Sequence, residues 1–142
     1  MIGPASLSLQ CPAMKLTRIG FGVQRTDAEP MLASFKFADG TTLQIPNVVI
    51  PPTNVHRVGL GHWSVDACIG QGGGMTVNLP KEPVVVDLLT LTVTAKAITA
   101  TVQVALPDGS TGSGSVVFPD CVFDLLSSTA QSVTAEGTVT FR

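Results

Sequence analysis

The sequence predicts an all-β fold, either a β-sandwich or a partly closed β-barrel, with at most one short helix. Three observations support this prediction: apolar residues recur at every second position, threonine and valine dominate the alternating stretches, and turn-forming residues separate these stretches. The chain has 142 residues, enough for one domain with its own core and too few for two enzymatic domains. We therefore expect a single β domain spanning residues 1–142.

The alternating stretches give the expected strands in chain order. The last of them, "SVTAEGTVTF", places Val133, Ala135, Val139 and Phe141 on one face and threonines on the other. The expected strands are residues 6–10, 16–25, 32–38, 43–50, 63–69, 75–79, 89–95, 100–106, 115–118 and 132–141. At most one short helix is expected, and the only segment that tolerates it is residues 120–130, where Asp120 could be the N-cap but serines and threonine weaken the helix.

Two Asp-Gly turns indicate a possible internal duplication. "FKFADGTTLQIPNVVIP" at residues 35–51 resembles "VALPDGSTGSGSVVFP" at residues 104–119, and the two turns are 108 − 39 = 69 positions apart. The strands that follow and a third block, Ser64-Val65 against Ser132-Val133, are offset by 68. Either two related β-meanders of about residues 1–71 and 72–142 complete one sandwich or barrel, or similar hairpins resemble one another by chance.

Composition excludes several classes of partner. Eight basic and ten acidic residues give a net charge of −2, which provides no basic surface for nucleic acid or an anionic membrane. The hydrophobic fraction of 44% with only 13% charged residues is best explained by burial between subunits, so we expect a homo-oligomer. The amino terminus has no pattern of a secretory signal, which predicts synthesis in a cytoplasm.

The sequence offers one candidate metal-binding set and no candidate catalytic site. His56, His62, Asp66 and Cys68 carry suitable ligand atoms, and the last three share one parity of a strand, but His56 has no fixed spacing to them. We therefore assign no metal, cofactor-binding or catalytic residues and expect a protein that is not an enzyme. Serine motifs of hydrolases are absent. "GQGGGM" at residues 70–75 lacks the lysine and serine of a phosphate loop, so we interpret it as a flexible or tightly approached β-connection.

The cysteines and aromatic residues restrict the alternatives further. Cys11, Cys68 and Cys121 are an odd, widely spaced set, which favours buried or half-buried thiols over disulfides, with cross-links between subunits as the alternative. Trp63 is the only tryptophan and tyrosine is absent, which disfavours an aromatic binding cleft.

Residues 100–142, "ATVQVALPDGSTGSGSVVFPDCVFDLLSSTAQSVTAEGTVTFR", resemble the ending of tailed-bacteriophage tail-tube subunits, in which a strand, an Asp-Gly hairpin, a second strand, a polar linker and a last alternating strand close the protein. The resemblance implies a non-enzymatic virion subunit that is made in the host cytoplasm and assembles into stacked rings. That family also carries a helix packed on its sandwich and a long hairpin, for which residues 120–130 and 47–60 are the counterparts.

Two alternatives stay open beside the tail tube. A capsid decoration or cement protein would also be small, β-rich and symmetric, so the expected partners are further copies of the chain and virion proteins such as a sheath or a major capsid protein. From another class, a small β-sandwich module could bind a ligand.

Overall fold

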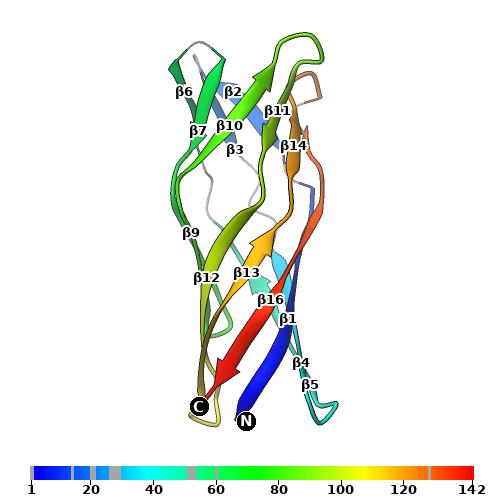
Figure 1. Cartoon of the computed structure of the whole chain (residues 1–142), viewed down its shortest axis with the longest axis vertical. Coiled ribbons are helices and arrows are strands. Elements are labelled where there is room, and N and C mark those ends of the chain that lie inside the picture. Colours follow the sequence, from blue (N-terminus) through cyan, green and yellow to red (C-terminus); the bar gives the residue numbers. More distant parts are fainter. Residues whose placement is uncertain are drawn as a thin grey trace.

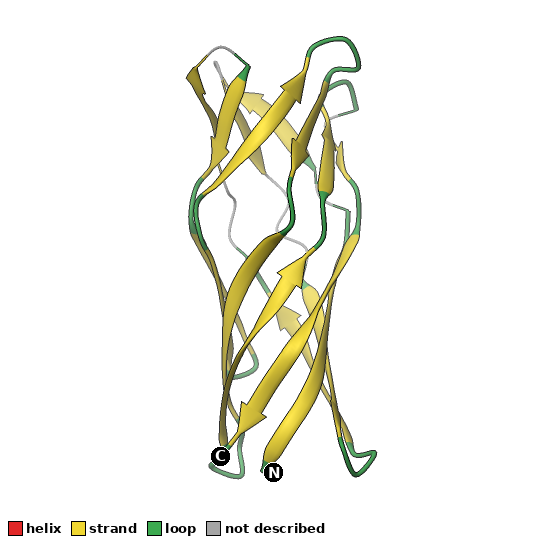
Figure 2. Cartoon of the chain, in the orientation of Figure 1, coloured by secondary structure: helices red, strands yellow, loops and turns green. Residues whose placement is uncertain are grey.

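The fold is an elongated, nearly closed barrel made of two sheets stacked end to end (Figure 1). The computed structural model describes residues 2–13, 15–19, 22–25, 30–50, 54–59, 61–127 and 129–142. All regular structure in these residues is β-strand (Figure 2), which confirms the all-β prediction. Among the described residues, no helix has the length and apolarity needed to cross a membrane.

Each of the two sheets has eight strands. The lower sheet of Figure 1 has the order β5-β4-β1-β16-β13-β12-β9-β8 and the upper sheet β15-β14-β11-β10-β7-β6-β3-β2. The lower strands are β1 (Gly3–Cys11), β4 (Met31–Phe37), β5 (Thr42–Val48), β8 (Cys68–Gly72), β9 (Met75–Leu79), β12 (Ile98–Ala105), β13 (Thr111–Phe118) and β16 (Val133–Phe141). The upper strands are β2 (Leu16–Ile19), β3 (Gly22–Arg25), β6 (Asn54–Gly59), β7 (His62–Val65), β10 (Glu82–Asp87), β11 (Thr92–Ala95), β14 (Cys121–Asp124) and β15 (Thr129–Ala130).

The chain passes alternately through the two sheets as an up-and-down meander, and the pairings are antiparallel. Single bridges close each ring of strands. Val49 and Gln71 exchange backbone hydrogen bonds of 3.1 and 3.0 Å between the β5 and β8 sides of the lower sheet, and Lys15 pairs with Thr129 beside the upper one. Closure leaves little strand edge for another copy of the chain to extend.

Where a strand of one sheet continues into the other, a two-residue break interrupts it and reverses the side-chain alternation. In β7 the inward residues are the odd-numbered Trp63 and Val65, whereas in β8 the inward residues are the even-numbered Cys68 and Gly70. The breaks within the described residues are at 66–67, 80–81, 96–97, 119–120 and 131–132. We call the level of these breaks the waist; it lies between a lower and an upper core.

The lower core is the larger of the two. It is built from alternate residues of β1, β4, β9, β12, β13 and β16, with Phe141 packed against Phe35 and Phe37 at ring-centre distances of 5.7 and 5.3 Å. The upper core consists of Val55, Val84, Val93 and Ala95 with half-buried neighbours such as Trp63 and Phe123. Outside the lower core, the sheet presents mostly threonine, serine and glutamine.

The glycine run at residues 70–74 allows β8 to lie directly against β5. A Cβ atom at Gly72 would meet the carbonyl oxygen of Asn47, and one at Gly70 would lie 2.7 Å from the Ile50 side chain. Gly73 and Gly74 have positive φ angles of 56° and 82° in the turn to β9. The interpretation of this run as a tightly approached β-connection is confirmed.

Residues 120–130, the one segment that tolerated a short helix, form no helix: the described part of this segment forms strands β14 and β15 joined by a turn. Asp120 does not cap a helix: its carboxylate accepts the backbone N–H of Ala97 at 2.7 Å, across the waist. Val122 and Phe123 favour a strand, and their pairing with β11 overrides the weak local preference for a helix.

The two Asp-Gly turns have the same geometry. Gly40 and Gly109 have φ angles of 88° and 89°, and Asp39 and Asp108 each accept the N–H of the residue two positions later at 2.9 Å. Both turns close hairpins of the lower sheet, β4–β5 and β12–β13. The third pair of matched blocks lies in different sheets, in β7 and at β16, so the structural likeness is that of two hairpins. The wider duplication stays a prediction.

Candidate functional site

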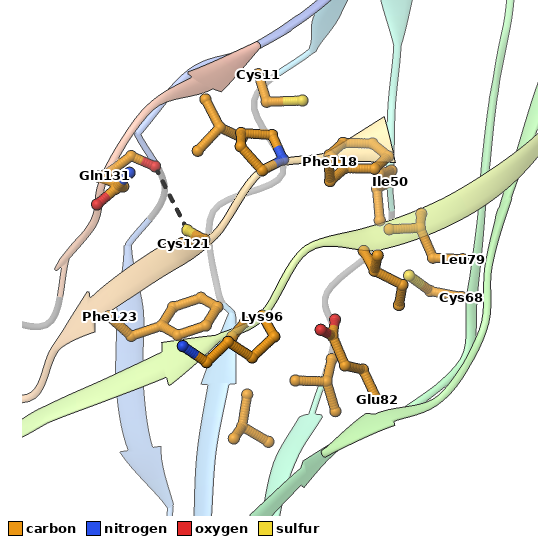
Figure 3. Close-up of a pocket in the computed structure, with 16 residues that line it drawn as sticks. Cys11, Ile50, Cys68, Leu79, Glu82, Lys96, Phe118, Cys121, Phe123 and Gln131 are labelled. Atoms are coloured by element: carbon orange, nitrogen blue, oxygen red, sulfur yellow. Dashed lines mark hydrogen bonds between the residues drawn. The ribbon is translucent and has the colours of Figure 1, made fainter. Parts of the chain in front are cut away.

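A cavity of about 140 Å³ lies inside the barrel at the waist (Figure 3). Both cores contribute to its wall, because side chains on either side of the strand breaks turn inward. The lining residues are Cys11, Ile50, Val55, Val65, Cys68, Leu79, Glu82, Ala95, Lys96, Ile98, Phe118, Pro119, Cys121, Phe123, Gln131 and Val133. Since an apolar cavity of about 150 Å³ in another protein holds benzene, this one accommodates a body about the size of one aromatic ring.

Glu82 is the acidic residue in this mainly apolar wall. Figure 3 shows its carboxylate directed into the space between Lys96 and Cys68. Burial raises the pKa of the Glu82 carboxyl, and the negative charge of Asp120 raises this pKa further. A half-buried carboxylate at this position is therefore the polar feature that a bound molecule would meet.

The three cysteines, far apart in the sequence, all line this cavity. Cys11 is buried, and its Sγ lies 3.2 Å from the Met31 Sδ; Cys68 and Cys121 are half-buried. Burial and then the charge of Glu82 raise the pKa of the Cys121 thiol to about 11, so this thiol is neutral at neutral pH. The cysteines thus have the predicted burial and form a soft, weakly polar part of the wall.

The candidate metal set is divided between two faces of the barrel. Cys68 points inward toward the cavity, while His56 lies on β6 and Asp66 in the break after β7, with their side chains in contact. His62 is an exposed residue at the start of β7. Among the described residues, no group of three or more His, Cys, Asp or Glu side chains is placed to hold a metal ion. Because the side-chain alternation reverses at residues 66–67, Cys68 faces the cavity while His62 and Asp66, which are also even-numbered, do not.

The structure instead joins His56 and Asp66 to a serine that sequence reasoning missed. The Ser64 Oγ lies 2.9 Å from His56 Nε2, and His56 Nδ1 lies 3.3 Å from Asp66 Oδ1. This is the order in which serine hydrolases connect nucleophile, base and orienting acid. However, Ser64 is only 6% exposed and lies between its strand neighbours His56 and Pro83. The neighbouring strands restrict access to Ser64, and its contact with His56 links β6 to β7.

Two adjacent turns at the upper end share the pattern Asp-Leu-Leu followed by a hydroxyl residue, "DLLT" and "DLLS". The carboxylates of Asp87 and Asp124 accept the backbone N–H groups of Leu89 and Leu126 at 2.8 and 2.9 Å, and these bonds lower the pKa of both carboxyls. The leucines stand out into solvent: Leu88, Leu89 and Leu126 are 72%, 97% and 75% exposed. Because β11 pairs with β14, the two turns lie side by side, and we call these three residues the leucine tips.

Comparisons with protein-family models, with curated proteins and with solved structures find no match for this chain.

Proposed function

We propose that this protein is a non-enzymatic binding barrel that holds one small, mainly apolar molecule in the waist cavity. The mainly apolar cavity of about 140 Å³ supports this proposal. A ligand that fills this volume removes its own apolar surface and that of the wall from water, at roughly 25 cal/mol per Å² of area buried. It also gains dispersion contacts with the wall.

Binding is favoured over catalysis by the state of the nucleophilic groups. Cys121 is protonated at neutral pH, with a pKa of about 11, and the Ser64 hydroxyl is covered by its neighbours. The cavity wall can therefore bind a molecule by its shape and polarity, but neither of these two groups supplies a reactive nucleophile.

Thermal unfolding and fluorescence test this proposal with aromatic probes of matched size. Trp63, the only tryptophan, packs beside the upper core and reports on that part of the barrel. Toluene and benzyl alcohol should raise the melting temperature in a saturable manner, since a ligand that binds only the folded state stabilises it by RT ln(1 + [L]/Kd). No shift and no change in fluorescence at millimolar concentrations of either probe would contradict the proposal.

A second candidate function is a self-assembling structural subunit of a tailed-bacteriophage virion, in a tail tube or as a capsid decoration protein. Its support is the resemblance of residues 100–142 together with the leucine tips. Three leucines exposed side by side lose apolar contact with water when another virion protein or another copy covers them. In this proposal the end of the barrel mediates assembly, since the closed rings of strands leave little edge for sheet extension.

Particle shape tests the structural candidate. Hollow tubes or hexameric rings in negative-stain electron microscopy would support a tail tube, and discrete trimers a decoration protein. Leu89→Asp should dissociate either assembly, because it places a charge in the interface that covers the leucine tips. Ser113→Asp, at an exposed position of β13, is the matched control for added charge. A monomer at all concentrations would contradict this candidate.

A further inference from the structure

We propose that the waist cavity selects ligands with a positively charged or N–H-donating head group on an apolar body, and that the Glu82 carboxylate makes this selection. The proposal rests on the proposed function of the cavity as a binding site and names the chemical class of its ligand. Small aromatic or alkyl amines belong to this class.

The strand alternation directs Glu82 into the barrel. Glu82 is the first residue of β10, and Val84 and Val86, at the same parity, pack into the upper core. A residue two positions before Val84 on the same strand lies on the same inward face. The reversal at residues 80–81 is what gives Glu82 this orientation, since continued alternation from Val77 and Leu79 would have turned it outward.

No protein group satisfies the carboxylate within the part of the chain that the structure describes. Lys96 lines the same cavity, but no ion pair or hydrogen bond joins it to Glu82 among the described residues. Figure 3 shows the Lys96 ammonium directed toward the Phe123 side of the cavity. A half-buried carboxylate beside apolar walls gains most from a ligand that brings its own donor or positive charge.

On the Glu82 side of the cavity, away from the Lys96 ammonium, the neighbouring charges favour a cation over an anion. Asp120 lies close enough to Glu82 to raise the pKa of its carboxyl, and Glu82 in turn raises the pKa of the Cys121 thiol. Both effects report a negative potential at this side of the cavity. A carboxylate ligand would meet repulsion there, whereas an ammonium would be attracted by both acids.

Three probes of one size isolate the head group: benzylamine, benzyl alcohol and benzoate. Each carries one aromatic ring, the body that the cavity volume accommodates, and one polar group. Calorimetric titration at neutral pH should give benzylamine an affinity about 10-fold or more above that of benzyl alcohol, with benzoate weakest. Glu82→Gln should abolish the advantage of benzylamine and change the affinity for benzyl alcohol by no more than about 2-fold. Glu136→Gln, the same substitution at an exposed position of β16 outside the cavity, is the matched control and should keep the advantage.

The outcomes separate this inference from the proposed function. If benzyl alcohol binds and benzylamine has no advantage, or if Glu82→Gln keeps that advantage, the selection by Glu82 is refuted and the binding site stands. If none of the probes binds, the proposed function itself fails and the inference falls with it. An acid titration of the wild-type protein gives a test without mutation: the advantage of benzylamine should decline as Glu82 is protonated, and an advantage that persists at low pH would refute the role of Glu82.

Discussion

Filling the waist cavity should stabilise the protein, and Ala95→Val is the substitution that tests this. Ala95 lines the cavity from β11, a strand in which a β-branched residue is favoured. The change adds two methyl groups to unoccupied apolar space, worth about 1.6 kcal/mol at roughly 0.8 kcal/mol per buried carbon. After a small allowance for strain, we expect a gain of about 1 kcal/mol in the free energy of unfolding, and a rise of about 4 °C in the melting temperature.

Urea denaturation measures the gain, and Ala135→Val is its matched control. Ala135 is fully buried on β16 in the lower core and does not line the cavity, so the same two methyl groups have no space there. We expect the control to lose about 1 to 3 kcal/mol through overpacking. Ala95→Val should also weaken benzyl alcohol binding, because the methyl groups occupy the ligand volume. If Ala95→Val destabilised the protein as much as Ala135→Val does, the cavity would not be usable space and the reasoning would be refuted.

Three further substitutions test other contacts. Glu82→Gln should raise the free energy of unfolding above neutral pH and leave it unchanged below the ordinary carboxyl pKa of 4.5. The reason is that a carboxyl whose pKa is raised in the folded state destabilises the fold only when it ionises. Equal urea midpoints of the variant and the wild type at pH 8 would contradict this. Gly137→Ala should lower the free energy of unfolding by about 3 kcal/mol or more, because the added Cβ would meet the carbonyl oxygen of Ser115 in β13. Gly59→Ala is the control and should lower it far less in the same denaturation assay, because no atom lies within 4 Å of a Cβ at that position. Ser64→Ala should lower the free energy of unfolding by about 1 kcal/mol, because the hydrogen bond to His56 of β6 is lost. A fluorophosphonate probe should leave Ser64 of the wild-type protein unlabelled, and labelling would indicate an accessible nucleophile.

Period-two alternation predicted the long strands of the lower sheet, and the Asp-Gly pairs predicted two tight turns, because both depend on local chemistry. Strands β6 and β10 were not predicted, and residues 89–91, expected to begin a strand, lie in a turn where Leu89 is exposed. Alternation with period two identified the core face of β16, and Asp39-Gly40 and Asp108-Gly109 form the expected hairpin turns. Residues 120–130, where at most a short helix was expected, form β14 and β15 instead, because pairing with β11 lies outside any local window.

The cavity could not be predicted, because the alternation is reversed at the waist. Continuous alternation through residues 66–67 would have put Asp66 and Cys68 on one face, and continuous alternation through residues 80–81 would have turned Glu82 to solvent. Each reversal depends on how neighbouring strands pair across the break. The "DLLT" and "DLLS" repeat, by contrast, was present in the sequence as a signal for the leucine tips.

The waist breaks also determine how the molecule should open. The ladders of backbone hydrogen bonds are interrupted at this level, so the amide protons above and below it belong to separate protective units. The upper unit has the smaller core, and we expect its amides to exchange with solvent at a lower opening free energy than those of β1 and β16. Because residues of both units line the cavity, a bound ligand would bridge the two units and should raise the opening free energy of the upper amides.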